Sequence, residues 1–333
     1  MKAIIPVAGV GTRLRPLTLS KPKVLLNVAG KPIIAHILDH VAGTRIDHIV
    51  FIVGYMKEEF EQWAKDRYPD LRLEFVEQTE ILGLGHAVGM GLSEDDGEVM
   101  VILGDTIFEL NLDEVLQSKY SSLGVQEVED ARRFGVVMLE DDFITDLVEK
   151  SPEPPSNLAI VGLYFIKNGG LLKSCIDGII SDNVTVKGEY QITDALKRMV
   201  DSGEKMTTFS IQGWHDCGTA DTLLDSNKYL LKISEADASG LEEYRPGNVI
   251  HPPVFIDDDV RISNSVIGPY VSIGRGAEIE GSIVEDSIIE EKAHISSALL
   301  KRSIIGKEAA ITGQYQQLNL SDYSSVVIPE KGD

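Results

Sequence analysis

Residues 2–28, KAIIPVAGVGTRLRPLTLSKPKVLLNV, place a short apolar run directly before a loop that contains two glycines, two arginines and two lysines. The run is continuous and rich in isoleucine and valine, which is typical of a strand covered on both faces of a sheet. A glycine loop after such a strand exposes backbone N–H groups. Together with guanidinium and ammonium groups, they suit a polyphosphate. The stretch predicts an α/β fold with an anion site after its first strand.

The loop is neither of the two common phosphate loops. GVGTRL lacks the GK[ST] ending of a P-loop and the third glycine of the dinucleotide fingerprint. Pro16 and Pro22 stiffen it, which a basic solvated turn would not require. The candidate anion-binding side chains are Arg13, Arg15, Lys21 and Lys23.

Composition limits the partners of the chain. The 333 residues carry a formal net charge of −22, which argues against general nucleic-acid or anionic-membrane binding. No apolar stretch approaches the roughly 20 residues of a membrane span. Cys175 and Cys217 form no motif and fit a reducing cytoplasm. The length predicts two domains.

Strand and helix patterns alternate through the first two-thirds of the chain. Strand-like runs at 2–8, 47–55, 71–78 and 98–105 are separated by segments with helical spacing. This βαβ series predicts a doubly wound, Rossmann-like mixed sheet. Further strands are expected around FGVVMLE and LAIVGLYFIK, with helices at YQITDALKRMV and ADTLLDSNKYLLKI.

A different pattern follows a predicted linker at 234–250. Ile267, Ile273 and Ile279 recur every six residues, as do Ile289 with Ile295 and Ile305 with Ile311. Hexapeptide repeats of this kind form a short left-handed parallel β-helix with aliphatic side chains inside. The predicted domains are a catalytic domain at 1–233, the linker, the β-helix at 251–315 and a tail at 316–333.

The segment at 9–33, GVGTRLRPLTLSKPKVLLNVAGKPI, resembles the signature of the sugar-phosphate nucleotidyltransferases. This family includes glucose-1-phosphate thymidylyl- and uridylyltransferases and mannose-1-phosphate guanylyltransferase. The resemblance implies that Arg13 lies on the leaving pyrophosphate and Lys23 contacts the transferring phosphate. It also implies that the loop encloses the nucleoside triphosphate through Ala8, Gly9, Gly11 and Thr12.

The segment EQTEILGLGHAV at 77–88 resembles the part of the family that reads the base. Gln78 and Gly83 occupy the matching positions. Ile81 and Gly85 stand where the family often has proline and alanine, which leaves the choice of base open.

Two acidic residues are implied as magnesium ligands. Asp105 follows a buried strand in LGDTIF, and Asp216 lies in GWHDCGT. Two carboxylates, with waters and phosphate oxygens, complete an octahedral Mg²⁺. Asp216 alone could instead cap the following helix. His215 and Cys217 beside it are not expected to form a nucleophile or zinc set, because adjacent residues of an extended chain point to opposite faces. Cys217 is expected to be a small buried residue.

Motifs later in the chain provide the candidate residues for binding the sugar-1-phosphate. The resemblance assigns sugar and sugar-phosphate binding to Gly135, Glu149, Lys150, Gly162 and Glu189. Glu149 and Glu189 would take sugar hydroxyls, and Lys150 the sugar phosphate. Tyr164 is a weaker candidate, Asp194 is expected to be structural, and Trp214 either lines the pocket or fills the core.

The reaction implied by the resemblance is nucleotidyl transfer from dTTP or UTP to glucose-1-phosphate. Mannose-1-phosphate with GTP is the second choice. Three alternatives remain: an acyl-transferring β-helix, disfavoured because only His251 and His294 lie near it; a non-catalytic regulatory homologue; and a scaffold built around the β-helix. The β-helix is expected to mediate homo-oligomerisation.

Overall fold

The computed structural model describes residues 1–234, 244, 246–313 and 319–327. The chain divides into two compact units: one of Met1–Gly9 with Ile37–Trp214, the other of Val10–His36 with His215–Asp333. This division differs from the predicted catalytic domain at 1–233. The loop after the first strand and the helix that ends at Ile233 pack with the C-terminal strands instead.

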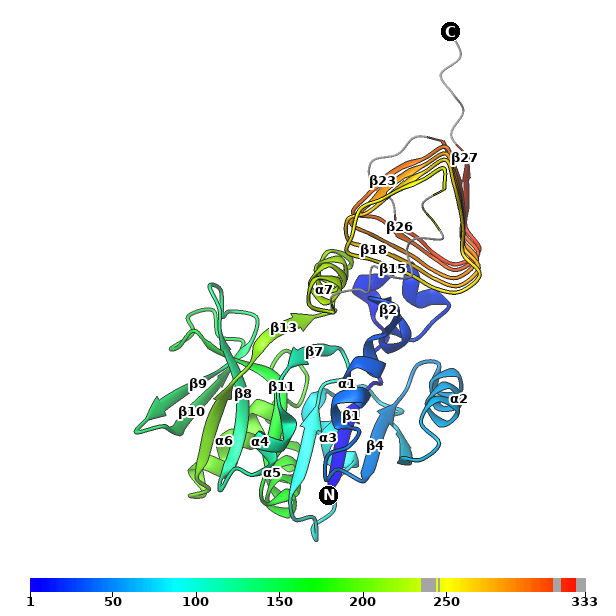
Figure 1. Ribbon diagram of the computed structural model, residues 1–333. Helices are drawn as coiled ribbons and strands as arrows, with labels where there is room; N and C mark the ends of the chain where they lie inside the picture. Colours follow the sequence, from blue (N-terminus) through cyan, green and yellow to red (C-terminus); the bar gives the residue numbers. More distant parts are fainter. Residues whose placement is uncertain (235–243, 245, 314–318, 328–333) are drawn as a thin grey trace. The chain divides into compact units, whose positions relative to one another are not determined.

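The first unit contains a nine-stranded mixed sheet (Figure 1). Its main order is β10-β9-β11-β6-β1-β4-β5, and β8 pairs with β11 and β12. The strands β6, β1, β4 and β5 are parallel, whereas β11 is antiparallel to β6, β8 and β9. The strands are β1 (Lys2–Pro6), β4 (His48–Val53), β5 (Arg72–Glu77), β6 (Val99–Ile102), β8 (Ser121–Glu127), β9 (Gly135–Glu140), β10 (Phe143–Glu149), β11 (Leu158–Ile166) and β12 (Met206–Ser210).

Helices cover both faces of this sheet, which explains the continuous apolar strands. In β4, Val50 and Ile52 belong to the core cluster formed with α3 (Leu84–Met90), α5 (Gly169–Ser181) and α6 (Ile192–Asp201). Phe51, between them, points to the opposite face and packs edge-on against Phe60 of α2 (Lys57–Arg67), with ring centroids 4.9 Å apart. Alternate side chains of a strand point to opposite faces, so both must be apolar here.

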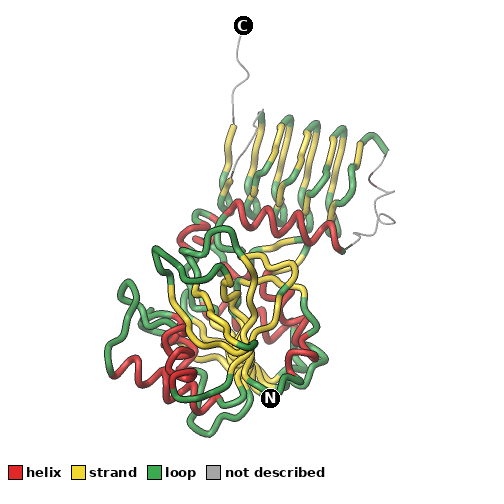
Figure 2. The backbone as a smooth tube through the Cα atoms, turned by 90° about the vertical axis from the view of Figure 1, so that its left-hand side faces the viewer, coloured by secondary structure: helices red, strands yellow, loops and turns green. Residues whose placement is uncertain are grey.

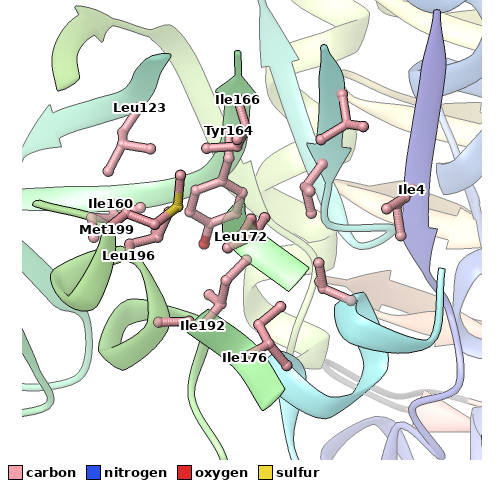
Figure 3. Packing of buried hydrophobic residues seen from close by; sticks show 14 of the residues in the cluster. Ile4, Leu123, Ile160, Tyr164, Ile166, Leu172, Ile176, Ile192, Leu196 and Met199 are labelled. Atoms are coloured by element: carbon pink, nitrogen blue, oxygen red, sulfur yellow. The ribbon is translucent and has the colours of Figure 1, made fainter. Parts of the chain in front are cut away.

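The core between the sheet and α5 and α6 is built from aliphatic side chains and one tyrosine (Figure 3). Ile176 of α5 and Leu196 and Met199 of α6 are fully buried, and Tyr164 of β11 points its ring among them. Burial of such side chains contributes about 1.5–3 kcal/mol each. This core fixes β11, whose neighbours include the predicted sugar-binding residues.

Several elements of the first unit were not expected from the sequence. These are β7 (Thr106–Glu109), α4 (Leu112–Leu116), β8, β10, α5, β12 and β13 (Gln212–Asp216), the strand that leads from the first unit into the second. Helix α1 (Ile33–Val41) also runs from one unit into the other. The predicted fold class is confirmed in both of its parts, the mixed sheet and the parallel β-helix.

In the second unit, short parallel strands stack into three sheets (Figures 1 and 2). The first sheet consists of β14 (Val249–Ile250), β17 (Val266–Ile267), β20 (Ile283–Glu285) and β23 (Leu299–Lys301). The second consists of β15 (Val254–Ile256), β18 (Val271–Ile273), β21 (Ser287–Ile289), β24 (Ile304–Ile305) and β26 (Asn319–Leu320). The third consists of β16 (Arg261–Ser263), β19 (Glu278–Glu280), β22 (His294–Ser296), β25 (Ala310–Thr312) and β27 (Ser325–Val327).

The interior of the β-helix is the aliphatic column that the sequence predicted. Ile267, Ile273 and Ile279 are at most 1 % exposed and lie in one core cluster. The coils are nevertheless shorter than three hexapeptides, which would need about 18 residues. Val254 pairs with Val271 and Val271 with Ser287, so these coils take 17 and 16 residues. The first of these coils is shortened between Ile262 and Ile267, and the second around Val284, which follows Ile279 and precedes Ile289 by five residues instead of six.

The β-helix extends beyond its predicted limits at both ends. Its first strand, β14, lies inside the predicted linker 234–250, and β26 and β27 lie inside the predicted tail 316–333. The rest of the linker around 235–243 lies outside the described residues, as do 314–318 and 328–333. The predicted boundaries missed these strands because β14 and β26 hold only two residues each.

The loop Val10–His36 has its own local structure in the second unit. It forms three 3-10 turns, Thr12–Leu14, Leu17–Leu19 and Lys23–Leu25, and a hairpin of β2 (Asn27–Val28) and β3 (Lys31–Pro32). Helix α7 (Ala220–Ile233) packs against β18 and β21 in the same unit. The loop is therefore an ordered element of the second unit.

Candidate active site

Gly11 and Lys23 form the centre of the glycine loop. Gly11 has φ 67°, and a Cβ atom there would come within 3.0 Å of both the Lys23 Cβ and the Thr18 Cγ2. The Gly11 carbonyl accepts hydrogen bonds from Thr18 Oγ1 and from the Leu14 amide, each at 2.9 Å. The left-handed backbone and the missing side chain thus let the loop close around the stem of Lys23.

The four cations of the loop have different environments. Arg13 and Arg15 are exposed, whereas Lys23 is 9 % exposed. Lys21 donates a hydrogen bond of 3.1 Å to Glu290 of the β-helix. Among the four predicted anion-binding cations, Lys21 has its ammonium group paired with a carboxylate of its own chain.

Arg13 and Asp216 lie beside each other in the second unit. A Cβ atom at Gly218 would lie 2.9 Å from both carboxylate oxygens of Asp216 and 3.3 Å from a terminal guanidinium nitrogen of Arg13. Gly218 therefore leaves room for two predicted functional side chains of opposite charge. A carboxylate next to an arginine can orient the guanidinium group.

Asp216 does not cap helix α7. The N-cap is Thr219, whose Oγ1 accepts from the Thr222 amide at 3.3 Å, and the Thr222 hydroxyl accepts from the Thr219 amide at 3.0 Å. This capping box satisfies the first helical N–H groups without the aspartate. The helix-cap alternative for Asp216 is therefore wrong.

The neighbours of Asp216 contact other residues of the second unit. The His215 ring packs at a tilt of 40° against the Tyr229 ring, with centroids 4.1 Å apart, and Cys217 is fully buried with its thiol 3.4 Å from Ser226 Oγ. Cys217 is thus the small buried residue that was expected. Among the described residues, which include both cysteines, there is no disulfide.

In the first unit, the parallel strands bring four predicted or newly found residues to one edge of the sheet. Ala8 follows β1, Gly54 follows β4, Gln78 follows β5 and Asp105 follows β6. A Cβ atom at Gly54 would lie 3.0 Å from the Ala8 Cβ, so the two backbones are in contact. The carboxyl edge of such a sheet is where α/β proteins bind ligands.

The predicted base-reading residues are connected to each other. Gln78 is buried, and its Nε2 lies 3.0 Å from His86 Nδ1. Gly83 has φ 111°, and a Cβ atom there would lie 2.6 Å from the Tyr190 carbonyl oxygen and 2.9 Å from the Glu189 Cβ. Glu189, a predicted sugar-binding residue, therefore lies next to the base-reading segment.

Glu149 is the centre of the predicted sugar site. Its Oε2 accepts from Thr193 Oγ1 at 2.6 Å, and its Oε1 lies 2.9 Å from Lys150 Nζ. A Cβ atom at Gly135 would lie 2.7 Å from Glu149 Oε2 and 2.9 Å from Thr193 Oγ1. The structure thus brings Gly135, Glu149 and Lys150 together and adds Thr193, which the sequence analysis did not single out.

Two further groups respond to the charge of Glu149. Burial, and then the charge of Glu149, raises the pKa of the Tyr164 phenol above its ordinary value. The same two causes, in the same order, raise the pKa of Asp194. Asp194 Oδ2 is buried and accepts no hydrogen bond from any described residue. A structural role for Asp194, as expected from the sequence, does not account for this buried oxygen without a hydrogen bond.

Gly162 and Trp214 have clear local roles. Gly162, at φ 81°, lies where the pairing of β11 with β8 shifts register, and its carbonyl accepts from the Leu103 amide at 2.9 Å. A Cβ atom there would lie 2.7 Å from the Leu103 side chain. Trp214 packs edge-on against Phe134, with ring centroids 5.3 Å apart.

The predicted oxygen donors for a hard cation are Asp105 in the first unit and Asp216 in the second. The described residues contain no group of three or more His, Cys, Asp or Glu side chains that could hold a metal ion. Asp105 and Asp216 offer carboxylates of the type that Mg²⁺ accepts with waters and phosphate oxygens completing its shell. The donor chemistry therefore fits magnesium bound together with a nucleotide better than a permanent protein-only site.

The sequence and geometry agree with a family match. Residues 2–233 match the family described as Nucleotidyl transferase, which is well over half of the chain. The chain belongs to this family. The match covers the glycine loop, the base-reading segment and the Glu149 cluster.

Curated relatives within the nucleotidyl transferase family carry different names. A "Bifunctional protein GlmU" of Methanocaldococcus jannaschii is 40 % identical over 242 residues, which cover 72 % of this chain and 57 % of that protein. The chain thus spans little more than half of that relative's length. A "Glucose-1-phosphate thymidylyltransferase" of Streptomyces antibioticus is 30 % identical over 361 residues, with 98 % of this chain and 99 % of that protein covered.

A solved member of the fold also resembles this chain. The structure described as UDP-glucose pyrophosphorylase complexed with UDP-glucose superposes with a TM-score of 0.60 at 25 % identity. It covers 70 % of this chain and 98 % of the other. Nearly a third of this chain therefore has no counterpart in that structure.

Sequence reasoning missed residues that act through distant contacts. Gly54 directly follows a strand that the sequence predicts, so its position at the edge of the sheet could have been predicted. Thr193 lies in the quoted motif EYQITDAL, but its partner Glu149 is 44 residues away. Glu290 had no signal, because it reads as one of many acidic residues on the β-helix.

Proposed function

We propose that this protein transfers a nucleotidyl group from a nucleoside triphosphate to a sugar-1-phosphate and releases pyrophosphate. The observation that carries the proposal is the glycine loop, in which Gly11 closes on Lys23. In the same unit Arg13 lies beside Asp216. The family match and the cluster around Glu149 support a sugar-phosphate acceptor.

The proposed step is one in-line displacement. A phosphate oxygen of the sugar-1-phosphate forms a bond to the α-phosphorus of the triphosphate while the bond from that phosphorus to the bridging oxygen breaks. The electron pair of the broken bond leaves with pyrophosphate. The attacking oxygen is already an anion, so no general base is required.

Cationic side chains provide the main contribution of the protein. Two negatively charged reactants must approach each other, and one unlike charge pair at 4 Å is worth about 4 kcal/mol at an effective dielectric constant of about 20. Arg13 is proposed to bind the leaving pyrophosphate and Lys23 the transferring phosphate. Lys150 is proposed to bind the sugar phosphate. Positioning and charge neutralisation are the expected sources of catalysis.

Asp105 and Asp216 are proposed to hold Mg²⁺. When bound, the ion would neutralise phosphate charge and fix the orientation of the triphosphate. The carboxylates supply oxygen ligands of the preferred type. Arg13 lies beside Asp216, next to the proposed metal ligand.

The favoured substrates are dTTP or UTP with glucose-1-phosphate. Relatives named as a glucose-1-phosphate thymidylyltransferase and a UTP–glucose-1-phosphate uridylyltransferase support this choice. Mannose-1-phosphate with GTP is the second choice. Gln78 and Gly83 are proposed to contact the base, and Glu189 beside Gly83 to contact the sugar.

The other readings have less support. A non-catalytic homologue would not need Lys23, Arg13 and Asp216 in place. Several relatives are named "Bifunctional protein GlmU", and the match covers 57–77 % of their length, but that name does not say what the second activity is. His294, on the β-helix, pairs with Glu278 at 3.2 Å on an exposed surface.

A reducing cytoplasm and a homo-oligomer are proposed as the setting. No helix in the described part of the chain has both the length and the apolar character to cross a membrane. On the first sheet of the β-helix, Val249, Val266, Ile283 and Leu299 stack in register. Three of them are 41–49 % exposed, which offers an apolar stripe to a second copy.

A substrate matrix tests the proposal. Each of dTTP, UTP, GTP, CTP and ATP is incubated with glucose-1-phosphate, mannose-1-phosphate or N-acetylglucosamine-1-phosphate, and pyrophosphate release is measured. The proposal predicts release that requires both substrates and is greatest with dTTP or UTP and glucose-1-phosphate. Absence of release in every combination would refute catalysis and leave the non-catalytic reading.

A further inference from the structure

Glu290 is a buried acid of the β-helix that the proposed reaction does not use. It follows strand β21, and only 4 % of its surface is exposed. Buried carboxylates are uncommon unless charged or polar partners compensate their desolvation. The residues that bind its carboxylate therefore indicate the function of Glu290.

Both carboxylate oxygens of Glu290 accept hydrogen bonds from the glycine-loop segment. Its Oε2 accepts from Lys21 Nζ at 3.1 Å and from Asn27 Nδ2 at 3.0 Å, and its Oε1 accepts from the Asn27 amide at 3.3 Å. Lys21 and Glu290 are 269 residues apart in the chain, yet both belong to the second unit.

These two partners flank the turn that contains Lys23. Lys21 precedes it, and Asn27 follows it as the first residue of β2. Between them the Leu25 amide donates to the Pro22 carbonyl at 2.9 Å, and the Leu26 amide donates to the Lys23 carbonyl at 3.1 Å. One carboxylate thus fixes both ends of a single hydrogen-bonded turn.

The position of Lys23 also determines the glycine loop. Gly11 packs on the stem of Lys23, where a Cβ atom would come within 3.0 Å. A displacement of the turn would therefore move the Lys23 ammonium group or the backbone at Gly11. In phosphate transfer, a misplacement of about 1 Å can reduce the rate by about 100-fold.

The other anchors of the segment are neutral or carry one charge. Ser20 donates to Asp322 at 2.6 Å, Ser321 donates to the Pro16 carbonyl at 3.1 Å, and the Ala29 amide donates to Asn227 Oδ1 at 2.9 Å. Burial, the largest single cause, lowers the pKa of Lys21, but the charge and hydrogen bond of Glu290, with the charges of Asp322 and Glu291, together raise the pKa overall. Lys21 is therefore a cation at every pH of interest, and Glu290 is the anchor that neutralises it.

We propose that Glu290 is a positioning residue for Lys23, through which the β-helix sets the geometry of the catalytic loop. The inference rests on the proposed function of Lys23. It gives the β-helix a role in the reaction besides any role in assembly. It also explains why Lys21, two residues from Lys23, is not available to the nucleotide.

The test compares Glu290→Gln with Glu285→Gln in the full-length protein. Glu285 is a matched control, because it is an acid of the same β-helix that pairs with Lys301 on an exposed surface. Glu290→Gln is expected to lower kcat between about tenfold and about 100-fold. The KM for the sugar-1-phosphate should not change, and Glu285→Gln should resemble the parent protein.

A Lys23→Ala background separates positioning from general structural damage. If Glu290 acts through Lys23, then Glu290→Gln should change the residual rate of Lys23→Ala by less than about threefold. An equal loss in both backgrounds would overturn the proposal. If Lys23→Ala itself releases pyrophosphate normally, the proposed function fails instead.

A measurement without catalysis covers variants that are too slow to assay. Hydrogen exchange of peptides from residues 16–29 should accelerate in Glu290→Gln and stay unchanged in Glu285→Gln. Unchanged exchange in Glu290→Gln would contradict the proposal. Should Glu290→Gln fail to fold, Asn27→Ala removes one contact and leaves the ion pair intact, and a smaller loss of kcat in the same direction is expected.

Discussion

Gly11 and Lys23 are in direct contact: a Cβ atom at Gly11 would lie 3.0 Å from the Cβ of Lys23. Gly11→Ala would add this atom and place a side chain at φ 67°, which costs about 1–2 kcal/mol. We expect a lower free energy of unfolding and at least a tenfold loss of kcat, on the order of 1.4 kcal/mol in the barrier. Urea unfolding and pyrophosphate release measure the two effects.

Gly9→Ala provides the control for this substitution. Gly9 is not in the left-handed region, and a Cβ atom there would meet nothing within 4 Å. Its stability should be close to that of the parent protein. An equal loss of stability in both variants would show that the contact with Lys23 is not the cause.

Lys23→Ala removes the cation proposed to neutralise the transferring phosphate. Removal of one such preorganised group typically costs about 100- to 1,000-fold in kcat. The fold should persist, because the turn at Lys23–Leu25 is held by backbone hydrogen bonds. Steady-state kinetics and circular dichroism check both points, with Lys65→Ala on the exposed face of α2 as the control.

The proposed role of Lys23 follows from a sequence motif, whereas its contact with Glu290 could not be predicted from the sequence. The motif around Lys23 is contiguous, so spacing and chemistry were visible together. Glu290 contacts the motif from 269 residues away, and no local pattern reports such a pairing. The same distinction explains why the resemblance named Glu149 but not the hydrogen bond that orients it from Thr193.

The elements of the fold that could be predicted are those with a regular apolar spacing, and those without one were missed. Helix α7 was predicted at ADTLLDSNKYLLKI and spans Ala220–Ile233, because its apolar spacing and its threonine cap are local features. Strand β8, SSLGVQE, was missed, because serine and glycine hide a strand that is buried by its neighbours. The repeat predicted a β-helix but not the coil lengths of 17 and 16 residues, because the length of each coil depends on how its strands pair with those of the next coil.

Asp105→Asn and Asp216→Asn test the proposed magnesium ligands. Each substitution removes one carboxylate charge, so turnover should fall by about 100-fold or more at low Mg²⁺. Excess Mg²⁺ should restore part of the rate, and EDTA should abolish it in the parent protein. Titration of the rate against Mg²⁺ is the measurement. Asp66→Asn, at an exposed position of α2, should titrate like the parent protein.

Two outcomes would contradict the proposed magnesium ligands. If either variant keeps the parent rate and the parent Mg²⁺ dependence, that aspartate is not a ligand. Activity that survives EDTA in the parent protein would remove the metal from the reaction.

Asp194→Asn should stabilise the protein near neutral pH. Burial, followed by the charge of Glu149, raises the pKa of Asp194 in the folded state above its ordinary value of 3.8. An acid with a raised pKa contributes full stability below its unfolded pKa, and this contribution is lost as the pH rises through the folded pKa. The benefit of asparagine should therefore be greatest at pH 7 and shrink towards pH 4.

Urea unfolding at several pH values measures this difference. The N-terminal turn of α6 favours a negative charge at this position and works against the effect. We nevertheless expect burial beside Glu149 to dominate, because Asp194 Oδ2 receives no hydrogen bond from the described residues. Asp201→Asn, at the exposed end of the same helix, is the control. A loss of stability in Asp194→Asn at pH 7 would contradict the argument.

The central claim is that an oxygen of the sugar-1-phosphate attacks the α-phosphorus of the nucleotide. Glucose-1-phosphate labelled with ¹⁸O in its non-bridging phosphate oxygens tests it most directly, with the products analysed by mass spectrometry. The account predicts that all label is found in the nucleoside diphosphate sugar and none in an equimolar amount of pyrophosphate. Label in the pyrophosphate, or pyrophosphate formed without the sugar nucleotide, would contradict it.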